Sequence, residues 1–337
     1  MTLSELLETV RRVEVRTNRL VNDTMVGAYL SHFRGRGMDF EELREYIPGD
    51  DVRDIDWNVT NRMGRPFVKR YREERELAVV LALDVSASSA FGSAERTKRE
   101  FATEIAATLA FSATRSSDKV ALLLFSDQVE LYLPPRKGRR HILRLIREML
   151  SLQPRRVGTD IPAALTFLNH VLHRRAIVFL LTDFLHSFGT PPPEGLDPDS
   201  VPPRVPPAEP VSSVEYGTGS GTHGSTLSHT RDVIQEIGLT NSRHDLVCVH
   251  LHDPRESVLP PAGLLTIEDA ETGELLELDS NRAGVRHLFA RTNADRLAAL
   301  DRALSQAGVD TLRLGTTEPF AHTLQRFFEL RRGRRRG

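Results

Sequence analysis

The sequence predicts an α/β fold built on a doubly wound, mostly parallel β-sheet. The first observation behind this prediction is that, from residue 77 onward, short continuous apolar runs alternate with longer segments of helical spacing. The second is that these runs are apolar throughout, which is typical of strands buried on both faces in a parallel sheet covered by helices. The 337 residues leave room for one such domain and additional elements.

Residues 1–76 are expected to form an accessory module in front of this domain. Residues 3–21 carry apolar side chains at helical spacing and predict one amphipathic helix. Residues 34–76 are rich in charges of both signs, with aromatic side chains between them and turn signals at 48–51 and 63–66. They predict short strands and turns in a segment too small to hold a core alone.

Residues 77–331 are expected to form the main domain, interrupted by the segment 189–228. Its strands are predicted at 77–84, 119–125, 129–133, 175–182, 245–251 and 310–314. Its helices are predicted at 94–114, 139–150, 161–173, 230–237, 284–306 and 319–331. Residues 264–279 contain a Glu-Thr-Gly-Glu turn and predict an inserted β-hairpin that interrupts the alternation.

Two segments of unusual composition complete this division of the chain. Residues 189–228 are rich in proline and glycine, and they predict a surface loop or linker because such a composition cannot build a packed core. Docking of a partner on its proline motifs is the alternative. Residues 332–337 form a basic tail, which is expected to be a solvated end rather than a nucleic-acid-binding arm.

Charge and hydropathy restrict the class of protein. The net charge of −1 gives no general attraction to nucleic acid or to an anionic membrane. No apolar run approaches the ~18 residues that span a bilayer, and the first residues lack the pattern of a secretory signal. Cys248 is the single cysteine and lies within an apolar run. Because a disulfide needs two cysteines, none can form within one chain. We therefore expect a cytoplasmic protein with no membrane insertion and no nucleic-acid partner.

Three short polar segments predict one metal site. Residues 84–88, Asp-Val-Ser-Ala-Ser, follow the first predicted strand of the main domain, and Thr-Asp at 182–183 ends another. Gly-Thr-Asp at 158–160 opens a predicted helix. Because ligand sites of open α/β sheets lie at the carboxyl ends of the strands, these segments are expected to converge there. Taken singly, each segment is also explained by an ordinary helix cap or turn.

The candidate ligands combine carboxylate and hydroxyl oxygens without His or Cys, which suits Mg²⁺ or Mn²⁺ better than zinc. They are Asp84, Ser86, Ser88, Thr159 and Asp183. The two aspartates are expected to act partly through water or by fixing the hydroxyl ligands. Such a site leaves a replaceable water on the ion, which a carboxylate of a partner protein can displace.

The sequence resembles a known family in several regions. The order Asp-x-Ser-x-Ser, Gly-Thr and Thr-Asp is similar to that of a von Willebrand factor type A domain. Residues 40–57, Phe-Glu-Glu-Leu-Arg-Glu-Tyr-Ile-Pro-Gly-Asp-Asp-Val-Arg-Asp-Ile-Asp-Trp, resemble the signature of the bacterial "domain of unknown function 58" family. In that family the signature runs into the metal-site strand, as it does here. The C-terminal part is also similar, with Asp253, Pro260 and residues 269–273.

This resemblance covers nearly the whole chain, except for residues 189–228, which are longer than the family's usual connection. It implies a von Willebrand factor type A-like sheet in which the first strand is central. It also implies a role as partner or adaptor of a MoxR-type AAA+ ATPase, or of its client protein, in protein assembly or activation.

Two classes of function are compatible with the residues themselves. We favour a non-catalytic, metal-dependent protein-binding adaptor, because the chain has no Gly-x-x-x-x-Gly-Lys-Ser/Thr phosphate loop with which to hydrolyse ATP. The alternative is a magnesium-dependent phosphoryl hydrolase, since magnesium and two aspartates at strand ends also describe such enzymes. The pairs His250/His252 and His170/His173 lack a third ligand at a spacing recognisable for zinc.

The charged residues of the signature segment have two interpretations. In the first, Trp57 is a packing anchor of the module, and the charges around it form ion pairs that hold the module to the main sheet. In the second, they form a surface on which a partner docks. The candidates for that surface are Arg44, Asp50, Arg53, Asp56 and Trp57.

Overall fold

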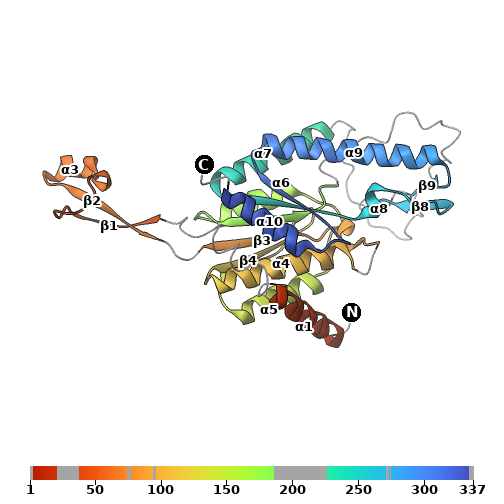
Figure 1. The fold of residues 1–337 in the computed structure, drawn as a ribbon, viewed down its shortest axis with the longest axis horizontal. Helices are drawn as coiled ribbons and strands as arrows, with labels where there is room; N and C mark the ends of the chain where they lie inside the picture. Colours follow the sequence, from red (N-terminus) through yellow and green to blue (C-terminus); the bar gives the residue numbers. More distant parts are fainter. Residues whose placement is uncertain are drawn as a thin grey trace, which may run out of the picture.

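A six-stranded sheet forms the centre of the protein (Figure 1). The computed structural model describes residues 3–20, 38–73, 77–93, 96–185, 226–270, 273 and 275–333. Across the sheet the strand order is β10-β7-β6-β3-β4-β5. The strands are β3 (Ala78–Asp84), β4 (Lys119–Phe125), β5 (Val129–Arg136), β6 (Ile177–Thr182), β7 (Asp245–His252) and β10 (Asp310–Gly315). All neighbouring pairs are parallel except β4 and β5, which are antiparallel.

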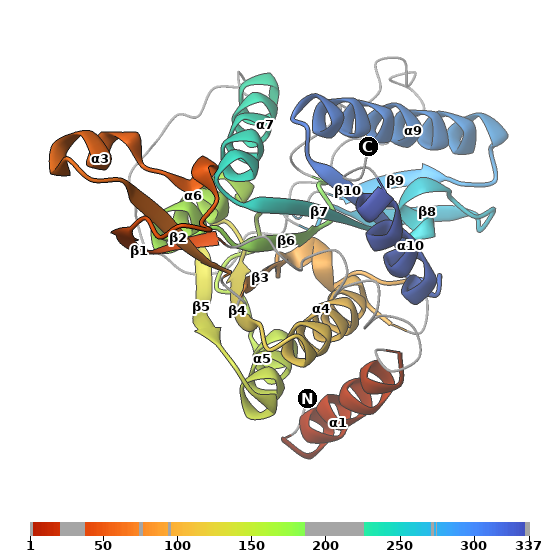
Figure 2. The same ribbon diagram turned by 60° about the vertical axis from the view of Figure 1, so that its left-hand side comes forward.

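Alternate residues of each central strand are buried on opposite faces of the sheet. Leu81 and Leu83 belong to one core, whereas Val80 and Ala82 belong to the other. The first core lies under α4 (Lys98–Arg115), α5 (Arg139–Ser151) and α10 (Phe320–Gly333), and the second under α6 (Ile161–Val171), α7 (Thr226–Arg243) and α9 (Ala283–Gln306). Figure 2 shows these two helical layers on either side of the strands. The predicted doubly wound α/β fold is therefore confirmed.

The chain reverses its direction of winding beside the central strand. From β3 it passes through α4 to β4 on one side, and after β5 and α6 it returns to β6 on the other side of β3. In doubly wound sheets this reversal opens a crevice at the carboxyl ends of the two strands that flank it. The segments that follow β3 and β6 are those in which the sequence predicts metal ligands.

Helix α1 (Leu3–Leu20) packs on the central domain. Its buried side chains Leu6, Val10 and Val13 lie against α4 and α5, because their spacing places them on one face of the helix. Ion pairs from Glu14 to Arg139 and from Arg16 to Glu104 flank this contact. In space, α1 thus belongs with the main domain rather than with the short strands that follow it.

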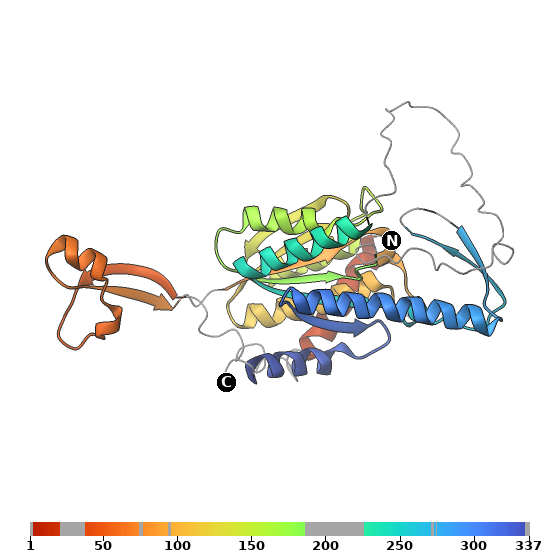
Figure 3. The same cartoon turned by 90° about the horizontal axis from the view of Figure 1, so that it is seen from above.

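The signature segment forms a small module that projects from the sheet (Figures 1 and 3). It consists of the antiparallel strands β1 (Met38–Glu45) and β2 (Phe67–Glu73), a 3₁₀ turn (Val52–Asp54) and the helix α3 (Trp57–Met63). Neither the 3₁₀ turn nor α3 contains a buried residue. The predicted short strands and turns are confirmed, and α3 is an addition, capped at its start by Asp56.

The remaining elements lie at the opposite end of the molecule. The predicted hairpin is present as β8 (Leu264–Glu268) and β9 (Leu275–Asp279), and α8 (Pro254–Ser257) precedes it.

Strand β5 is longer than predicted and includes two prolines, which an edge strand tolerates because only one side of it is paired. Most of the predicted loop 189–228 lies outside the described residues, and 226–228 begin α7. In the described parts of the chain, none of the helices is both long and apolar enough to cross a membrane.

Candidate metal site

Asp84 ends the central strand β3 and is held from both of the segments around it. Its Oδ1 accepts a hydrogen bond from the backbone N–H of Ser86 at 2.9 Å, which folds the chain into a turn. Its Oδ2 accepts one from the hydroxyl of Thr182, at the end of the neighbouring strand β6, at 2.7 Å. The side chain is buried, so these two donors fix the carboxylate at the carboxyl edge of the sheet.

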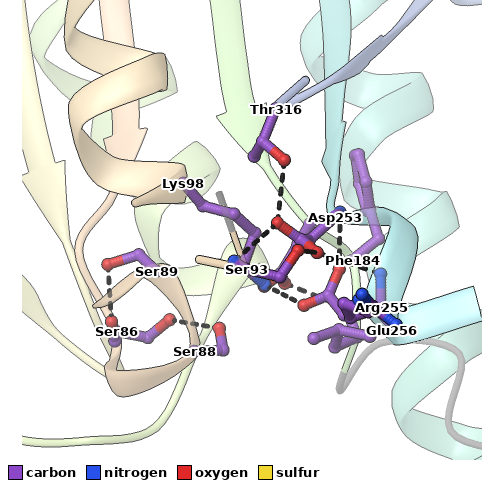
Figure 4. Close-up of polar contacts among 12 residues, drawn as sticks. Ser86, Ser88, Ser89, Ser93, Lys98, Phe184, Asp253, Arg255, Glu256 and Thr316 are labelled. Atoms are coloured by element: carbon purple, nitrogen blue, oxygen red, sulfur yellow. Dashed lines mark hydrogen bonds and ion pairs between the residues drawn. The ribbon is translucent and has the colours of Figure 1, made fainter. Parts of the chain in front are cut away.

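The two serines of the same segment present adjacent oxygen atoms (Figure 4). Ser86 Oγ and Ser88 Oγ lie 3.1 Å apart, and Ser89 donates to the carbonyl of Ser86 at 2.7 Å, which closes the 3₁₀ turn Ala87–Ala90. Neighbouring ligands of an octahedral magnesium ion, at 2.0–2.1 Å from the metal, are about 2.9 Å apart. The two hydroxyls are hydrogen-bonded to each other, and their spacing is also close to the one that a shared Mg²⁺ requires.

Asp183 reaches the same edge from the end of β6. Its Oδ1 accepts from the backbone N–H of Leu185 at 3.1 Å, and its Oδ2 accepts from Lys98 Nζ at 2.5 Å. Phe184, between Asp183 and Leu185 in the chain, has a φ of 54°, a left-handed conformation that is uncommon for a residue other than glycine. This turn directs the chain away from the sheet directly after the carboxylate.

The loop that carries Thr159 is anchored beside the serines. Ala87 donates its backbone N–H to the carbonyl of Val157 at 3.0 Å. Asp160 donates its backbone N–H to the carbonyl of Ser126, the residue after β4, at 2.9 Å. Thr159 lies between these two anchors and is partly buried. Asp160 accepts from the backbone N–H of Ala163 and thereby caps α6, so its carboxylate has a structural task.

A cavity of about 10 Å³ lies behind these residues. It is lined by Asp84, Ser89, Lys98, Arg99, Ala102, Thr182, Asp183 and Leu251. This volume corresponds to about one water-sized sphere. Ser86, Ser88 and Thr159 do not line it, so it is a water-sized space behind the candidate ligands rather than the position that all five would share.

Negative charge at this edge is only partly balanced. Burial and the charge of Asp183 raise the pKa of Asp84 to about 6, against its hydrogen bonds from Thr182 and Ser86. Burial also raises the pKa of Glu256, on α8, although Lys98 opposes this. Burial alone would raise the pKa of Asp183 as well, but the positive charge and hydrogen bond of Lys98 oppose this effect, and the pKa of that carboxyl lies below its usual value. Lys98 makes ion pairs with Asp183 and Glu256, and the charge of Arg296 on α9 also acts on both carboxylates. The raised pKa of Asp84 indicates that its own negative charge is not fully compensated, which favours a further cation beside it.

The donor set fits magnesium by its chemistry. It consists of hydroxyl and carboxylate oxygens, and the described residues contain no group of three His, Cys, Asp or Glu that could hold a metal without hydroxyl ligands. Four of the five predicted ligands, Asp84, Ser86, Ser88 and Asp183, come together at one edge, with the loop of Thr159 beside them. Metal binding by these residues stays a prediction.

The candidate docking residues of the signature module lie apart from this edge. Arg44 pairs with Asp50 at 2.7 Å and Lys69 pairs with Asp56 at 3.0 Å, so these ion pairs connect parts of the module to each other. The expectation that the charges of this segment hold the module to the main sheet stays a prediction. Because 61% of Trp57 is exposed, its position favours the docking interpretation over that of a packing anchor. Arg53 is likewise exposed.

Sequence reasoning missed Lys98 and Glu256, whose ion pair lies next to Asp183. Asp253 and Glu256 form a capping box at α8, a pattern that the sequence Asp-Pro-Arg-Glu signals. The sequence around Lys98 and around Glu256 contains no local pattern that predicts their proximity to the candidate metal ligands. The pair His250/His252, weighed for zinc, has its rings 5.9 Å apart, and no described third ligand completes a site.

The strand order, the single antiparallel edge strand and the polar residues after β3 and β6 define an α/β domain of the von Willebrand factor type A kind. The sequence model of the family described as "Protein of unknown function DUF58" matches residues 42–193 and 224–299, and the chain belongs to this family.

Known proteins are similar to this chain over much of its length. A Mycobacterium tuberculosis protein described as uncharacterized is 26% identical over 97% of this chain and 90% of its own length. The solved structure of a conserved hypothetical protein, BatB from Bacteroides thetaiotaomicron, has a TM-score of 0.40 and 13% identity, covering 76% of this chain and 98% of its own. The solved structure of the SpRpn10 VWA domain has a TM-score of 0.34 and 9% identity, and the match covers 74% of this chain and 94% of that domain.

Proposed function

We propose that this protein is a non-catalytic adaptor that binds another protein through a magnesium ion at the carboxyl edge of its sheet. The observation that carries the proposal is the convergence of Asp84, Ser86 and Ser88 with Asp183 at one edge of the sheet, where the charge of Asp183 and burial raise the pKa of Asp84. Manganese satisfies the same donors.

Some of the candidate residues would bind the ion, and others would orient these ligands. Ser86 and Ser88 would bind the ion through neutral hydroxyls, and Thr159 would add a third from the neighbouring loop. Asp84, fixed by Thr182 and by the N–H of Ser86, would orient these ligands and supply charge together with Asp183. When bound, the ion supplies a coordination position for an oxygen ligand of a partner. A carboxylate of the partner would take that position by displacing a water molecule from the ion.

The absence of a phosphate loop in the sequence supports an adaptor over a nucleotide hydrolase. Membership of the family supports, as partner, a MoxR-type AAA+ ATPase or its client protein, as the sequence resemblance implies. The exposed Trp57 and Arg53 on the projecting module would provide a second contact with that partner. Asp50 and Asp56 would act there by holding Arg44 and α3 in place.

The test measures association of the purified protein with a MoxR-type ATPase from the same organism, in magnesium and in EDTA. Wild type should bind in magnesium and not in EDTA, and Asp84→Asn should bind in neither condition. Asp160→Asn is the matched control, because it removes a nearby carboxylate charge and keeps an oxygen that can cap α6. Equal association of wild type in magnesium and in EDTA would contradict the metal-dependent mechanism. Magnesium-dependent cleavage of phosphate esters that is lost in Asp84→Asn would support the hydrolase alternative.

A further inference from the structure

Lys98 places its ammonium group between a metal-site carboxylate and a second carboxylate on α8. Its Nζ lies 2.5 Å from Asp183 Oδ2 and also pairs with Glu256 Oε1. Only 2% of the Lys98 side chain is exposed. In Figure 4 the side chain runs from the start of α4 toward Glu256.

This position is unfavourable for a lysine unless the carboxylates hold it there. Lysine is almost never fully buried without a partner, because its ammonium group loses its hydration. Lys98 is also the first residue of α4, directly after the cap Thr97, where the helix dipole disfavours a cation. The two carboxylates therefore offset both costs, and the ammonium group is kept beside the metal ligands.

Both oxygens of Asp183 are already engaged in this arrangement. Oδ1 accepts from the backbone of Leu185, and Oδ2 accepts from Lys98. Each carboxylate oxygen can accept a second contact, so a metal ion that draws on Asp183 would share this carboxylate with the ammonium group and be repelled by its charge. The cavity behind the site is lined by Asp84, Asp183 and Lys98, so the ammonium group lies beside both candidate carboxylate ligands.

Glu256 offers the ammonium group an alternative partner of fixed position. Its Oε2 accepts from the backbone N–H of Asp253 at 3.0 Å, which leaves Oε1 directed at Lys98. Asp253 is itself held by Ser93 and by the hydroxyl of Thr316, at 2.8 Å, after β10 (Figure 4). Glu256 can therefore retain Lys98 when Asp183 turns to another cation.

We infer that Lys98 is a tethered cation that competes with the divalent metal for Asp183, and that Glu256 holds the ammonium group while the metal is bound. The inference rests on the metal site of the proposed function and adds a control of its affinity. Lys98 neutralises part of the buried charge when the metal is absent. It thereby stabilises the metal-free protein and weakens metal binding.

The test is a Mg²⁺ titration of the purified full-length protein by calorimetry, with the thermal midpoint as a second readout. In Lys98→Met the competing charge is gone and the apolar stem is kept, so Mg²⁺ should bind at least about tenfold more tightly, while the thermal midpoint in EDTA falls. In Glu256→Gln the ammonium group has only Asp183 as a charged partner, so Mg²⁺ should bind more weakly than to wild type. Lys119→Met, the same change at an exposed position at the start of β4, is the control and should match wild type.

The opposite signs of the two effects separate competition from a supporting role. If Lys98 merely oriented Asp183 as a ligand, both Lys98→Met and Glu256→Gln would weaken Mg²⁺ binding, and that result would overturn the inference. Unchanged affinity in Lys98→Met would overturn it as well. Should Lys98→Met fail to fold, the double variant Lys98→Met/Glu256→Gln removes the buried ion pair as a unit and should bind Mg²⁺ more tightly than Glu256→Gln does. Absence of Mg²⁺ binding in every variant and in wild type would instead contradict the metal site itself.

Discussion

Thr182 donates its hydroxyl hydrogen to Asp84 across the boundary between β6 and β3, at 2.7 Å. The contact joins the last residues of the two strands at which the winding direction of the sheet reverses. Both side chains are buried, so water does not replace the hydrogen bond if it is lost. The orientation of a candidate metal ligand thus depends on a residue that is not itself expected to touch the metal.

The first prediction concerns this hydrogen bond. Thr182→Val removes the donor and keeps the shape of the side chain, so Mg²⁺ binding should weaken by about tenfold or more, as is typical when a supporting partner of a ligand is lost. The measurement is a calorimetric Mg²⁺ titration. Thr103→Val is the matched control, because Thr103 is equally buried but its hydroxyl donates to a helix carbonyl, that of Arg99. Equal affinities of Thr182→Val and wild type would contradict a role of Thr182 in orienting Asp84.

The second prediction concerns pH and His250, which is buried on β7. Burial and the charges of nearby basic side chains lower the pKa of His250 to about 3. The groups that act on it are Arg313 on β10, His252 on β7, Arg296 on α9 and, in the opposite sense, Asp183 after β6. As the pH falls below about 6.5, the unfolded chain takes up a proton at this residue that the folded protein does not accept until about pH 3.

The stabilising contribution of a neutral His250 is therefore complete above about pH 6.5 and is lost as the pH falls. The slope from this residue reaches about 1.4 kcal/mol of unfolding free energy per pH unit. His250→Phe keeps a ring beside Phe184, and it should flatten the dependence between pH 6.5 and 4 in denaturant titrations. His287→Phe, the same change at an exposed position on α9, is the control. An unchanged slope in His250→Phe would show that other groups cause the acid sensitivity.

The third prediction compares a buried ion pair with an exposed one. Arg331 on α10 pairs with Asp245 of β7 at 2.5 Å and also with Asp310 of β10, and only 7% of its side chain is exposed. Arg331→Met leaves both carboxylates without this partner and should lower the unfolding free energy by about 3–5 kcal/mol. Arg16→Met breaks a pair with Glu104 in which 56% of the arginine side chain is exposed, so the loss should stay below about 1 kcal/mol. Similar losses in urea unfolding would contradict this assignment.

Local patterns predicted the alternation of strands and helices and the polar segments of the candidate site, and the family resemblance implied that the first strand is central. Asp84, Ser86 and Asp183 directly follow apolar strands, and parallel strands bring their carboxyl ends to one edge, so their convergence follows from strand order. Lys98 could not be predicted in the same way. It lies 85 residues from Asp183 and 158 residues from Glu256 in sequence, and the charged Arg96, Arg99 and Glu100 close to it in sequence suggest an exposed helix start.

Helix α1 and the signature module illustrate the same limit. The spacing of Leu6, Val10 and Val13 predicts a helix with one apolar face, but not that α4 and α5 cover that face. In the module, the aromatic Trp57 suggests a core residue by its composition alone. The short strands provide no second layer to bury it, so the side chain remains exposed.

The fourth prediction concerns Trp57, 61% of which is exposed on the projecting module. Because little of its surface is buried by the chain itself, Trp57→Ala should change the unfolding free energy by less than about 1 kcal/mol. If the module docks on the partner ATPase, the same variant should weaken that association by more than about tenfold, since tryptophan is a frequent anchor of protein interfaces. Leu264→Ala, an exposed apolar residue on the distant hairpin, is the control and should leave both quantities unchanged. A large loss of stability in Trp57→Ala would restore the interpretation of Trp57 as a packing anchor, and unchanged association would remove it from the docking surface.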